Sequence, residues 1–319
     1  MEKVQTHSVD MELFNQHLFD YLDSKVPFHK DIIHHLAIHR GKQLRAKLAL
    51  LCALLGGELN SKSYKAAMSA ELIHISSLLH DDIVDNSDQR RNAPSVNAKW
   101  SNKKALFSGQ IISMQAVLLN LNESDIDIFV PFGKIINPLV EAELLQLKKS
   151  SKINTSEEDY FKIIRAKTAL LFSASCEAGA VSNFTNSNQI EKLRQIGEYI
   201  GMAFQIRDDL FGYFTTETGK PNHNDFQEKK ATLPLIYTMN NVNIWKKWKL
   251  KRSIKSNHLN ERKIASIIDE VKKHNGIQYA QKKMIQFANN ALTLLKDFPP
   301  SNARFEIEQI IHFTTRRNH

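Results

Sequence analysis

The chain has 319 residues, of which 42% are apolar, and it carries a formal net charge of +9. The apolar content is enough for a substantial core, and the small numbers of glycine (11) and proline (8) favour long helices and argue against a many-stranded sheet protein. The positive charge fits an anionic ligand, an anionic membrane surface or solvated lysine-rich faces, but zinc-finger spacing and aromatic RNP patterns are absent, so we expect no nucleic-acid partner.

Apolar residues at helical spacing, with few breakers, mark most of the chain. The segments predicted to be helices are Leu44–Leu55, Ser63–Asp85, Asn102–Asn120, Asp125–Ser150, Ser156–Val181, Asn188–Phe214 and the chain from Thr232 onward. The first of these ends at Gly56-Gly57, a helix stop signal. We expect Pro131 and Pro138 to kink the fourth segment, and Ser156 followed by acidic residues is typical of an N-cap.

Two polar segments separate these helices. Asn86–Asn97 contains Pro94, and Thr215–Glu228 contains Gly219 and Pro221, so both are predicted to be loops. No repeat, low-complexity tract or linker of Gly, Ser and Pro divides the chain, and clear period-two alternation is hard to find. The sequence therefore predicts a single domain spanning residues 1–319, an all-α bundle of long antiparallel helices around a central cavity.

The basic tail and the cysteines bear on the compartment. The tail from Ile244 begins IWKKWKLKRSIK and could touch a membrane surface, although its irregular apolar spacing favours a solvated helix face. Cys52 and Cys176 lie in apolar stretches without metal-ligand spacing, as structural thiols in a reducing compartment do. The N-terminus has no apolar core of the signal-peptide type, and no run of 18 apolar residues occurs, so we expect a cytoplasmic protein.

An acidic cluster, HDDIVD, closes the second predicted helix at residues 80–85. Asp81 and Asp85 are four residues apart and would share one helix face, with Cβ atoms about 5–6 Å apart. The carboxylates repel each other and interact unfavourably with the helix dipole, so a hard cation such as Mg²⁺ would stabilise them. Considered alone, however, such a cluster is more commonly a solvated helix end.

A second acidic pair, Asp208-Asp209, lies in the strongly apolar sequence GMAFQIRDDLFGY. Buried carboxylates need a hydrogen-bonding partner or a metal, which sets this pair apart from an ordinary exposed face. Two acidic clusters at the ends of separate apolar helices could face each other and bind a diphosphate through several Mg²⁺ ions.

Basic residues of the phosphate-binding type accompany both acidic clusters. They are Lys42, Arg45, Arg90, Arg91, Lys167 (followed by Thr168), Lys220 and Lys230. Arginine binds phosphate oxygens in a bidentate manner, and lysine acts as a point charge. Each of these residues alone is more commonly a surface charge, but their occurrence together with two acidic pairs favours a diphosphate-binding enzyme.

In this order, from Gly41 to Tyr237, the motifs resemble the trans-isoprenyl diphosphate synthases, also called the polyprenyl synthetase family. Gly41-Lys42-x-x-Arg45 together with His74 resembles the family's isopentenyl diphosphate site, and Asp81-Asp82-x-x-Asp85 followed by Arg90-Arg91 resembles its first aspartate-rich motif. Lys167-Thr168 resembles the KT motif, and Phe204-Gln205-x-x-Asp208-Asp209 the second aspartate-rich motif. Gly219-Lys220-Pro221, Asn224-Asp225 and Lys230-x-Thr232-Leu233-Pro234 resemble the loop that follows it.

The resemblance implies an isoprenoid-synthase-type helical bundle that condenses isopentenyl diphosphate with an allylic diphosphate. It implies that Asp81, Asp85 and Asp208 bind Mg²⁺, with three ions when the diphosphate is bound. The implied catalytic residues are Asp81, Asp82, Asp85, Arg90, Lys167, Asp208 and Lys220. The implied substrate-binding residues are Gly41, Lys42, Arg45, His74, Arg90, Arg91, Lys167, Thr168, Gln205, Lys220 and Lys230. A homodimer is also implied, and a peripheral membrane contact for product release stays open.

Ser76 and Ser77 are the candidate determinants of product length. They lie about one helical turn before Asp81, roughly 6–8 Å along the helix beside which an apolar product would grow. Bulky aromatic residues there would block that path, whereas two serines leave it open. In the family, small residues at these positions resemble synthases of the hexaprenyl to octaprenyl range, so we predict a product longer than geranylgeranyl. The two serines are also explained if they only allow close helix packing.

Four positions depart from the family pattern. Gly212 stands in place of the third aspartate of the second motif, Asn92 and Ala142 stand in place of glycines, and Gln110 stands in place of an aspartate. Gly212 bears most on activity, which it could reduce, although Asp208 corresponds to the family's main ligand in that motif.

Two alternatives stay open. A class I terpene cyclase uses similar metal chemistry, but it would not need a second-substrate site such as Lys42, Arg45 and His74. A low-activity regulatory subunit of a synthase would be expected to lose its acidic clusters, and this chain keeps both.

Overall fold

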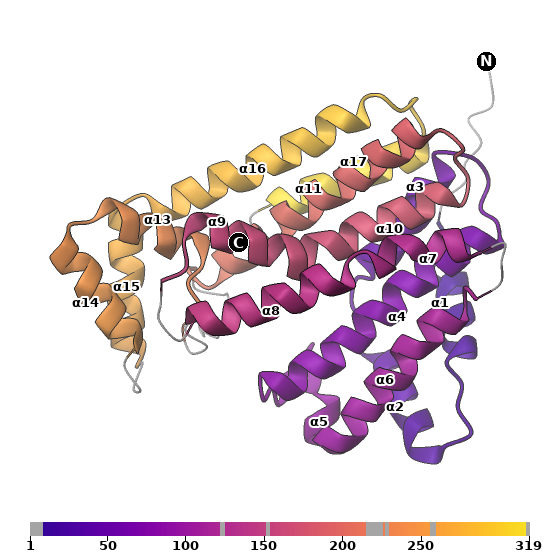
Figure 1. The fold of residues 1–319 in the computed structure, drawn as a ribbon, viewed down its shortest axis with the longest axis horizontal. Helices are drawn as coiled ribbons and strands as arrows, with labels where there is room; N and C mark the ends of the chain where they lie inside the picture. Colours follow the sequence, from indigo (N-terminus) through magenta and orange to yellow (C-terminus); the bar gives the residue numbers. More distant parts are fainter. Residues whose placement is uncertain are drawn as a thin grey trace. The chain divides into compact units, whose positions relative to one another are not determined.

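The computed structural model describes residues 9–121, 125–150, 154–214, 226, 230–255 and 260–316. Contacts divide the chain into two compact units. Unit 1 comprises Met1–Lys134, Ala174–Arg194 and Phe298–Ile307, and unit 2 comprises Ile135–Ser173, Gln195–Asp297 and Glu308–His319. Helices dominate both units (Figure 1), and the strands of the described residues are limited to β1 (Gln89–Arg90) and β2 (Ala93–Pro94), which confirms the all-α prediction.

Unit 1 is built around α4. Its complete helices are α1 (Met11–Tyr21), α2 (Pro27–Ile38), α3 (Leu44–Leu54), α4 (Ser61–Val84), α5 (Val96–Lys99), α6 (Asn102–Leu118) and α7 (Ile126–Gly133). The long helix α4 packs against α3 and lies beside α6 (Figure 1). Buried apolar side chains from several of these helices, including Phe14, Leu50, Leu72 and Ile112, form one core that holds α4 in place.

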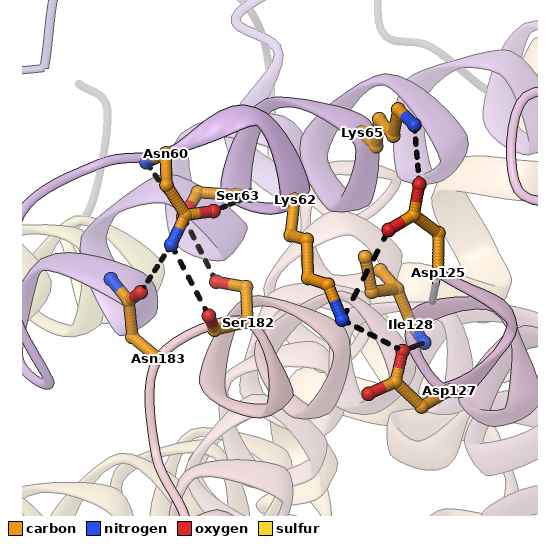
Figure 2. A network of polar contacts seen from close by, with 9 residues as sticks. All are labelled: Asn60, Lys62, Ser63, Lys65, Asp125, Asp127, Ile128, Ser182 and Asn183. Atoms are coloured by element: carbon orange, nitrogen blue, oxygen red, sulfur yellow. Dashed lines mark hydrogen bonds and ion pairs between the residues drawn. The ribbon is translucent and has the colours of Figure 1, made fainter. Parts of the chain in front are cut away.

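The N-terminal end of α4 is fixed by a polar network (Figure 2). Asn60 caps the helix by accepting a hydrogen bond from Ser63 N at 3.0 Å, and its amide donates to the carbonyl of Ser182 at 3.3 Å. Near this end, Lys65 forms an ion pair with the buried Asp125 at the start of α7, and Lys62 lies 3.7 Å from Asp127. With this end anchored, the opposite end of α4 presents the first acidic cluster.

Unit 2 contains most of the second half of the chain. Its elements are α8 (Ile136–Ser150), α9 (Glu157–Ile164), the π-helical turn η1 (Arg165–Ala169), α10 (Leu170–Val181), α11 (Ser187–Phe211), α13 (Leu233–Asn241), α14 (Ile244–Lys255), α15 (Glu261–Lys273), α16 (Gly276–Leu295) and α17 (Asn302–Thr315). Parts of α10, α11 and α17 belong to unit 1. Among the described residues, no helix is both long and apolar enough to cross a bilayer.

Three predicted elements need correction. The prediction of a loop over Asn86–Asn97 was partly wrong, because this segment contains the β1–β2 hairpin and the start of α5. Asp125–Ser150 forms two helices, α7 and α8, and Ser156–Val181 is interrupted by η1. The predicted loop Thr215–Glu228 lies outside the described residues except for Phe226.

Candidate active site

The three aspartates at the C-terminal end of α4 have different surroundings. Asp82 is buried, and Arg90 donates to its carboxylate through two nitrogens, with Nε 3.0 Å from Oδ1. Asp81 is half-buried, and Asp85, the C-cap residue, is exposed. Asp85 N donates to Asp81 O at 2.8 Å, which keeps the two residues one helical turn apart. Asp82 therefore holds Arg90, whereas Asp81 and Asp85 form the more solvent-facing pair.

The β1–β2 hairpin positions Arg90 and Arg91, the two arginines that follow this cluster. Arg91 (φ 54°) and Asn92 (φ 61°) form its two-residue turn, and left-handed backbone at both positions is the pattern of a type I′ turn. Asparagine tolerates this conformation better than most residues, which explains why Asn92 can replace the family's glycine. On one side of the turn, Arg90 contacts Asp82. Within the turn, Arg91 Nη1 donates a hydrogen bond to the carbonyl oxygen of His39 at 3.1 Å.

Arg45 and His74 form a polar contact between α3 and α4. Arg45 Nη1 donates to His74 Nε2 at 3.1 Å, which places the proton of the neutral ring on Nδ1. Burial, together with the neighbouring Arg45 and Arg91, holds the pKa of His74 well below its usual range, so the ring is neutral at physiological pH. Burial also lowers the pKa of Arg45 to about 10. The structure thus brings two of the predicted isopentenyl diphosphate ligands together.

The backbone before α3 brings Arg91 close to the same motif. A Cβ atom at Gly41 would lie only 2.6 Å from Arg91 Cζ, so glycine alone leaves room for this guanidinium. Gln43, the N-cap residue of α3, has left-handed backbone (φ 47°), and Lys42 is exposed. The predicted residues of the isopentenyl diphosphate site therefore lie together in unit 1.

Glu71 is a residue of this region that the sequence analysis missed. This residue is only 2% exposed, and it lines a cavity. Burial raises the pKa of Glu71, and the charges of Arg45 and Arg91 oppose that rise. Arg91 lines the same cavity. The signal in the sequence was an acidic residue in the middle of an apolar helix.

Ser76 and Ser77 make local hydrogen bonds. Ser76 is buried, and its hydroxyl donates to the carbonyl of Gly109 on α6 at 2.9 Å. Ser77 donates to the carbonyl of His74 at 2.8 Å within α4. Gly109 is itself tightly packed, because a Cβ atom there would lie 2.7 Å from His80 Nε2. Ser76 thus contributes to close α4–α6 packing, and the role of both serines in product length stays a prediction.

In unit 2, Lys167 and Thr168 lie in the π-helical turn η1. Such turns are rare and occur frequently at functional sites. Lys167 Nζ lies 2.6 Å from Glu143 Oε1 and donates to Gln146 Oε1 at 3.2 Å, both on α8. The departure at Ala142 leaves this arrangement intact, because the glutamate that follows it is the residue that contacts Lys167.

A chain of hydrogen bonds links η1 to the second acidic pair. Thr168 Oγ1 donates to Gln205 Oε1 at 2.6 Å, and Gln205 Nε2 donates to Asp209 Oδ1 at 2.7 Å. Tyr160 OH donates to the other carboxylate oxygen of Asp209 at 2.6 Å. Asp209 is therefore a buried structural acceptor, and Tyr160 is a second contributor that the sequence analysis missed.

Asp208 has a different environment from its neighbour. Its residue surface is exposed, although desolvation by the surrounding protein raises the pKa of its carboxyl and Arg207 opposes that rise. Arg207 is held by its donation to the carbonyl of Phe313 at 2.7 Å, and its guanidinium lies 4.3 Å from the Phe313 ring centroid. Asp208 is thus the solvent-facing carboxylate of the pair.

The remaining predicted residues lie around the end of α11. The helix ends at Phe211, so Gly212 lies just beyond its last residue and offers no third carboxylate. Lys220 lies outside the described residues, and Lys230 is half-buried before α13. The two sides of the intervening segment are joined by a 2.6 Å hydrogen bond between Tyr213 OH and Thr232 Oγ1.

Taken unit by unit, the solvent-facing carboxylates have the donor chemistry of a divalent-cation site that other ligands must complete. Within the described ranges, no group of three or more His, Cys, Asp or Glu side chains could hold a metal by itself. Mg²⁺, however, commonly takes one or two carboxylates and fills its other positions with water and phosphate oxygens. The Asp81–Asp85 pair in unit 1 and Asp208 in unit 2 have this character.

Comparisons with known proteins agree with this picture. The family model for polyprenyl synthetase matches residues 26–271. The chain is 30% identical to an octaprenyl diphosphate synthase from Haemophilus influenzae, over 97% of this chain and 94% of that protein. It is 29% identical to heptaprenyl diphosphate synthase component 2 from Geobacillus stearothermophilus, over 89% of this chain and 88% of that protein.

A solved structure is also similar. It is that of a polyprenyl synthase from Caulobacter crescentus, complexed with calcium and isoprenyl diphosphate. The sequence identity is 30%, the TM-score is 0.89, and the match covers 97% of this chain and 95% of that one.

Proposed function

Because this chain belongs to the polyprenyl synthetase family, we propose that it condenses isopentenyl diphosphate with an allylic diphosphate to give a linear polyprenyl diphosphate longer than geranylgeranyl diphosphate. The observation that carries this proposal is the grouping of Arg45, His74 and Arg91 in the same unit as the solvent-facing Asp81–Asp85 pair. A terpene cyclase has no second diphosphate substrate and would not need this basic group.

The metal requirement is part of the proposal. Asp81, Asp85 and Asp208 would hold Mg²⁺, with three ions in the presence of the diphosphate. When bound, these ions would withdraw electron density from the allylic diphosphate and offset the negative charge of the leaving group. The relative from Caulobacter crescentus, solved with calcium and isoprenyl diphosphate, supports the use of a divalent cation.

Different basic residues would bind the two diphosphate substrates. Lys167, Arg90, Lys220 and Lys230 would neutralise the charge that grows on the allylic diphosphate as its C–O bond breaks. Lys42, Arg45 and Arg91 would bind isopentenyl diphosphate, and neutral His74 would donate a hydrogen bond from Nδ1. The double bond of this substrate attacks the allylic carbon, and the released diphosphate accepts the proton that is lost.

Product length, location and assembly complete the proposal. The two curated relatives described above are named for octaprenyl and heptaprenyl products, which supports a long chain. We propose a cytoplasmic homodimer in which residues 1–319 form one domain. The exposed apolar stripe of α6, formed by Phe107, Ile111, Met114 and Leu118, supports self-association. The relative named component 2 keeps a second type of subunit as the alternative.

The test is incubation of the purified chain with Mg²⁺, labelled isopentenyl diphosphate and farnesyl diphosphate, followed by sizing of the extracted products. We expect a ladder that ends well beyond geranylgeranyl. Asp208→Asn should reduce incorporation by on the order of 100-fold or more, whereas Lys296→Gln, an exposed charge change outside the site, should leave it unchanged. A single short product would contradict the role of Ser76 and Ser77, and failure to incorporate any label would contradict the synthase assignment.

A further inference from the structure

Helix α14 packs one face against the rest of unit 2 and exposes another face to solvent. It packs against α13 and α15 (Figure 1), with Leu250 and Ile254 buried. Its exposed residues are Ile244, Trp245, Trp248, Lys249, Arg252 and Lys255. At about 100° per residue, these positions fall within an arc of about 140°. The spacing that looks irregular in the sequence therefore forms one continuous surface, the α14 outer face.

The apolar residues of the α14 outer face are unusually exposed. Trp245 and Ile244 are each 78% exposed, and Trp248 is 56% exposed. Tryptophan is normally well buried, because its ring has a large apolar surface. It is also enriched at the membrane–water interface, where the ring contacts acyl chains and the indole N–H reaches polar groups. These side chains therefore have the chemistry of an interfacial anchor.

The charge of this region is uniformly positive. Six of the twelve residues of α14 are lysine or arginine, and no acidic residue occurs between Glu228 and Glu261. Lys246 is neutralised by Glu270 of α15, at 3.3 Å. Among the described residues, no carboxylate pairs with Lys249, Arg252 or Lys255, the three cations of the outer face. The positive charge of this face is thus left for an external anionic partner.

We propose that the α14 outer face docks on the surface of an anionic lipid bilayer. Trp245, Trp248 and Ile244 would enter the headgroup region, and the three cations would contact lipid phosphates. A nucleic acid would satisfy the charges but would leave the exposed Ile244 without an apolar partner. Arg252 lies 5.2 Å from the Trp248 ring centroid, so charge and aromatic surface are presented together. This inference goes beyond the proposed prenyltransfer and does not depend on it.

The first test measures cosedimentation of the full chain with vesicles of phosphatidylcholine, alone or mixed with phosphatidylglycerol. We expect binding to the mixed vesicles that weakens as salt is added. The variant Lys249→Gln/Arg252→Gln/Lys255→Gln should bind on the order of 100-fold more weakly, since each cation near such a surface contributes a factor of about five. A matched control removes the same charge at the exposed positions Lys103, Lys282 and Lys296, also by substitution with glutamine, and should retain binding.

A second measurement tests the tryptophans directly. In a Trp100→Phe background, the two tryptophans of α14 are the only ones left. Their fluorescence should shift to the blue on mixed vesicles and be quenched by lipids with brominated chains, and Trp245→Ser/Trp248→Ser should bind at least about tenfold more weakly.

Three outcomes would overturn the proposal. They are absence of binding to mixed vesicles, equal loss in the matched control, and binding of an RNA fragment without vesicle binding and without a fluorescence shift. No substrate is present in either measurement, so a negative result would leave the proposed prenyltransfer untouched.

Discussion

Glu71 supplies a buried negative charge near two arginines, the half-buried Arg45 and the exposed Arg91. Its carboxylate acts electrostatically on both Arg45 and Arg91, and each of these guanidinium groups has its pKa lowered, mainly by burial. Removing the charge of the buried Glu71 would take a nearby counter-charge away from the half-buried Arg45, which is more costly than the loss of a surface pair. Glu71 thus has a positioning role, through the two arginines, in the proposed isopentenyl diphosphate site.

We therefore predict that Glu71→Gln lowers the free energy of unfolding by about 3 kcal/mol. It should also raise the KM for isopentenyl diphosphate more than it lowers kcat, because the cations lose their orientation. Urea unfolding and steady-state kinetics measure the two effects. Glu177→Gln is the matched control, since Glu177 pairs at 3.0 Å with an exposed lysine, Lys134, and should cost less than about 1 kcal/mol. Equal effects of the two variants would contradict the role of Glu71.

The backbone at Asn92 gives a second prediction. Its side chain is exposed and its φ is 61°, so a substitution there tests backbone conformation with little change in packing. Asn92→Val should destabilise the protein by about 1–2 kcal/mol, because a β-branched residue is strained in the left-handed region. Asn92→Gly should be neutral or stabilising. Thermal unfolding measures both, with Gln89→Val, at an exposed β1 position, as a control expected to change little. If Asn92→Val left the stability of the protein unchanged, the left-handed backbone assigned to residue 92 would be contradicted.

Sequence spacing predicts the adjacent aspartates Asp81-Asp82 and Asp208-Asp209. It does not predict which member of each pair faces the protein and which faces solvent. Adjacent residues on a helix point in different directions, so one aspartate of each pair is expected to face the protein. Which one does so depends on its partners. Asp82 is held by Arg90 from the hairpin, and Asp209 by Gln205, one turn earlier on the same helix, and by Tyr160 of α9. The contact with Tyr160, 49 residues away, leaves no mark in a local pattern.

At the scale of elements, helix ends follow their local signals closely, and backbone irregularities do not. Ser156 and Asp159 form a capping box at the start of α9, as the acidic first turn predicts. In contrast, nothing in the local sequence distinguishes the π-helical turn at Lys167 from ordinary helix. Tertiary contacts accompany that turn, including the contacts of Lys167 with α8 and of Thr168 with α11.

The cap of α9 gives a prediction with a defined pH window. The hydrogen-bonded ion pair with Lys149, at 2.6 Å, and the bonds from Ser156 lower the pKa of Asp159 to about 2. A carboxyl whose pKa is lower in the folded state stabilises the fold above its unfolded pKa and loses that effect as pH falls through the folded value. The stabilisation should therefore be complete above about pH 4 and largely lost near pH 2.

Asp159→Asn removes the charge but keeps an acceptor for the cap. Above about pH 4 it should lower the free energy of unfolding by roughly 2 kcal/mol, and the difference from the parent protein should shrink toward pH 2. Urea unfolding at a series of pH values measures this difference. Glu158→Gln, whose partner Lys162 is 63% exposed, serves as the control and should show only a small effect. A difference for Asp159→Asn that stays constant across the window would contradict the assigned role of the charge.

At the scale of the whole molecule, the proposed homodimer rests on α6. Phe107, Ile111, Met114 and Leu118 recur at helical spacing and are 42–61% exposed. A stripe of this kind on a single chain indicates a surface that another protein covers. In a two-fold interface formed by two copies of α6, a residue at one end of the stripe contacts a residue at the other end of the partner's stripe and the reverse, so one charge introduced into the stripe is buried twice.

We predict that Leu118→Glu converts the dimer to a monomer at concentrations where the parent protein stays dimeric, because each copy would bury an unpaired charge against the apolar stripe of the other. Sedimentation equilibrium over a range of concentrations measures this change. Ile38→Glu is the matched control, since Ile38 on α2 is as exposed as Leu118, at 61%, and it should leave the assembly unchanged. A parent chain that is monomeric at every concentration would overturn the homodimer. It would favour a second type of subunit on the α6 stripe, as the name of the component 2 relative allows.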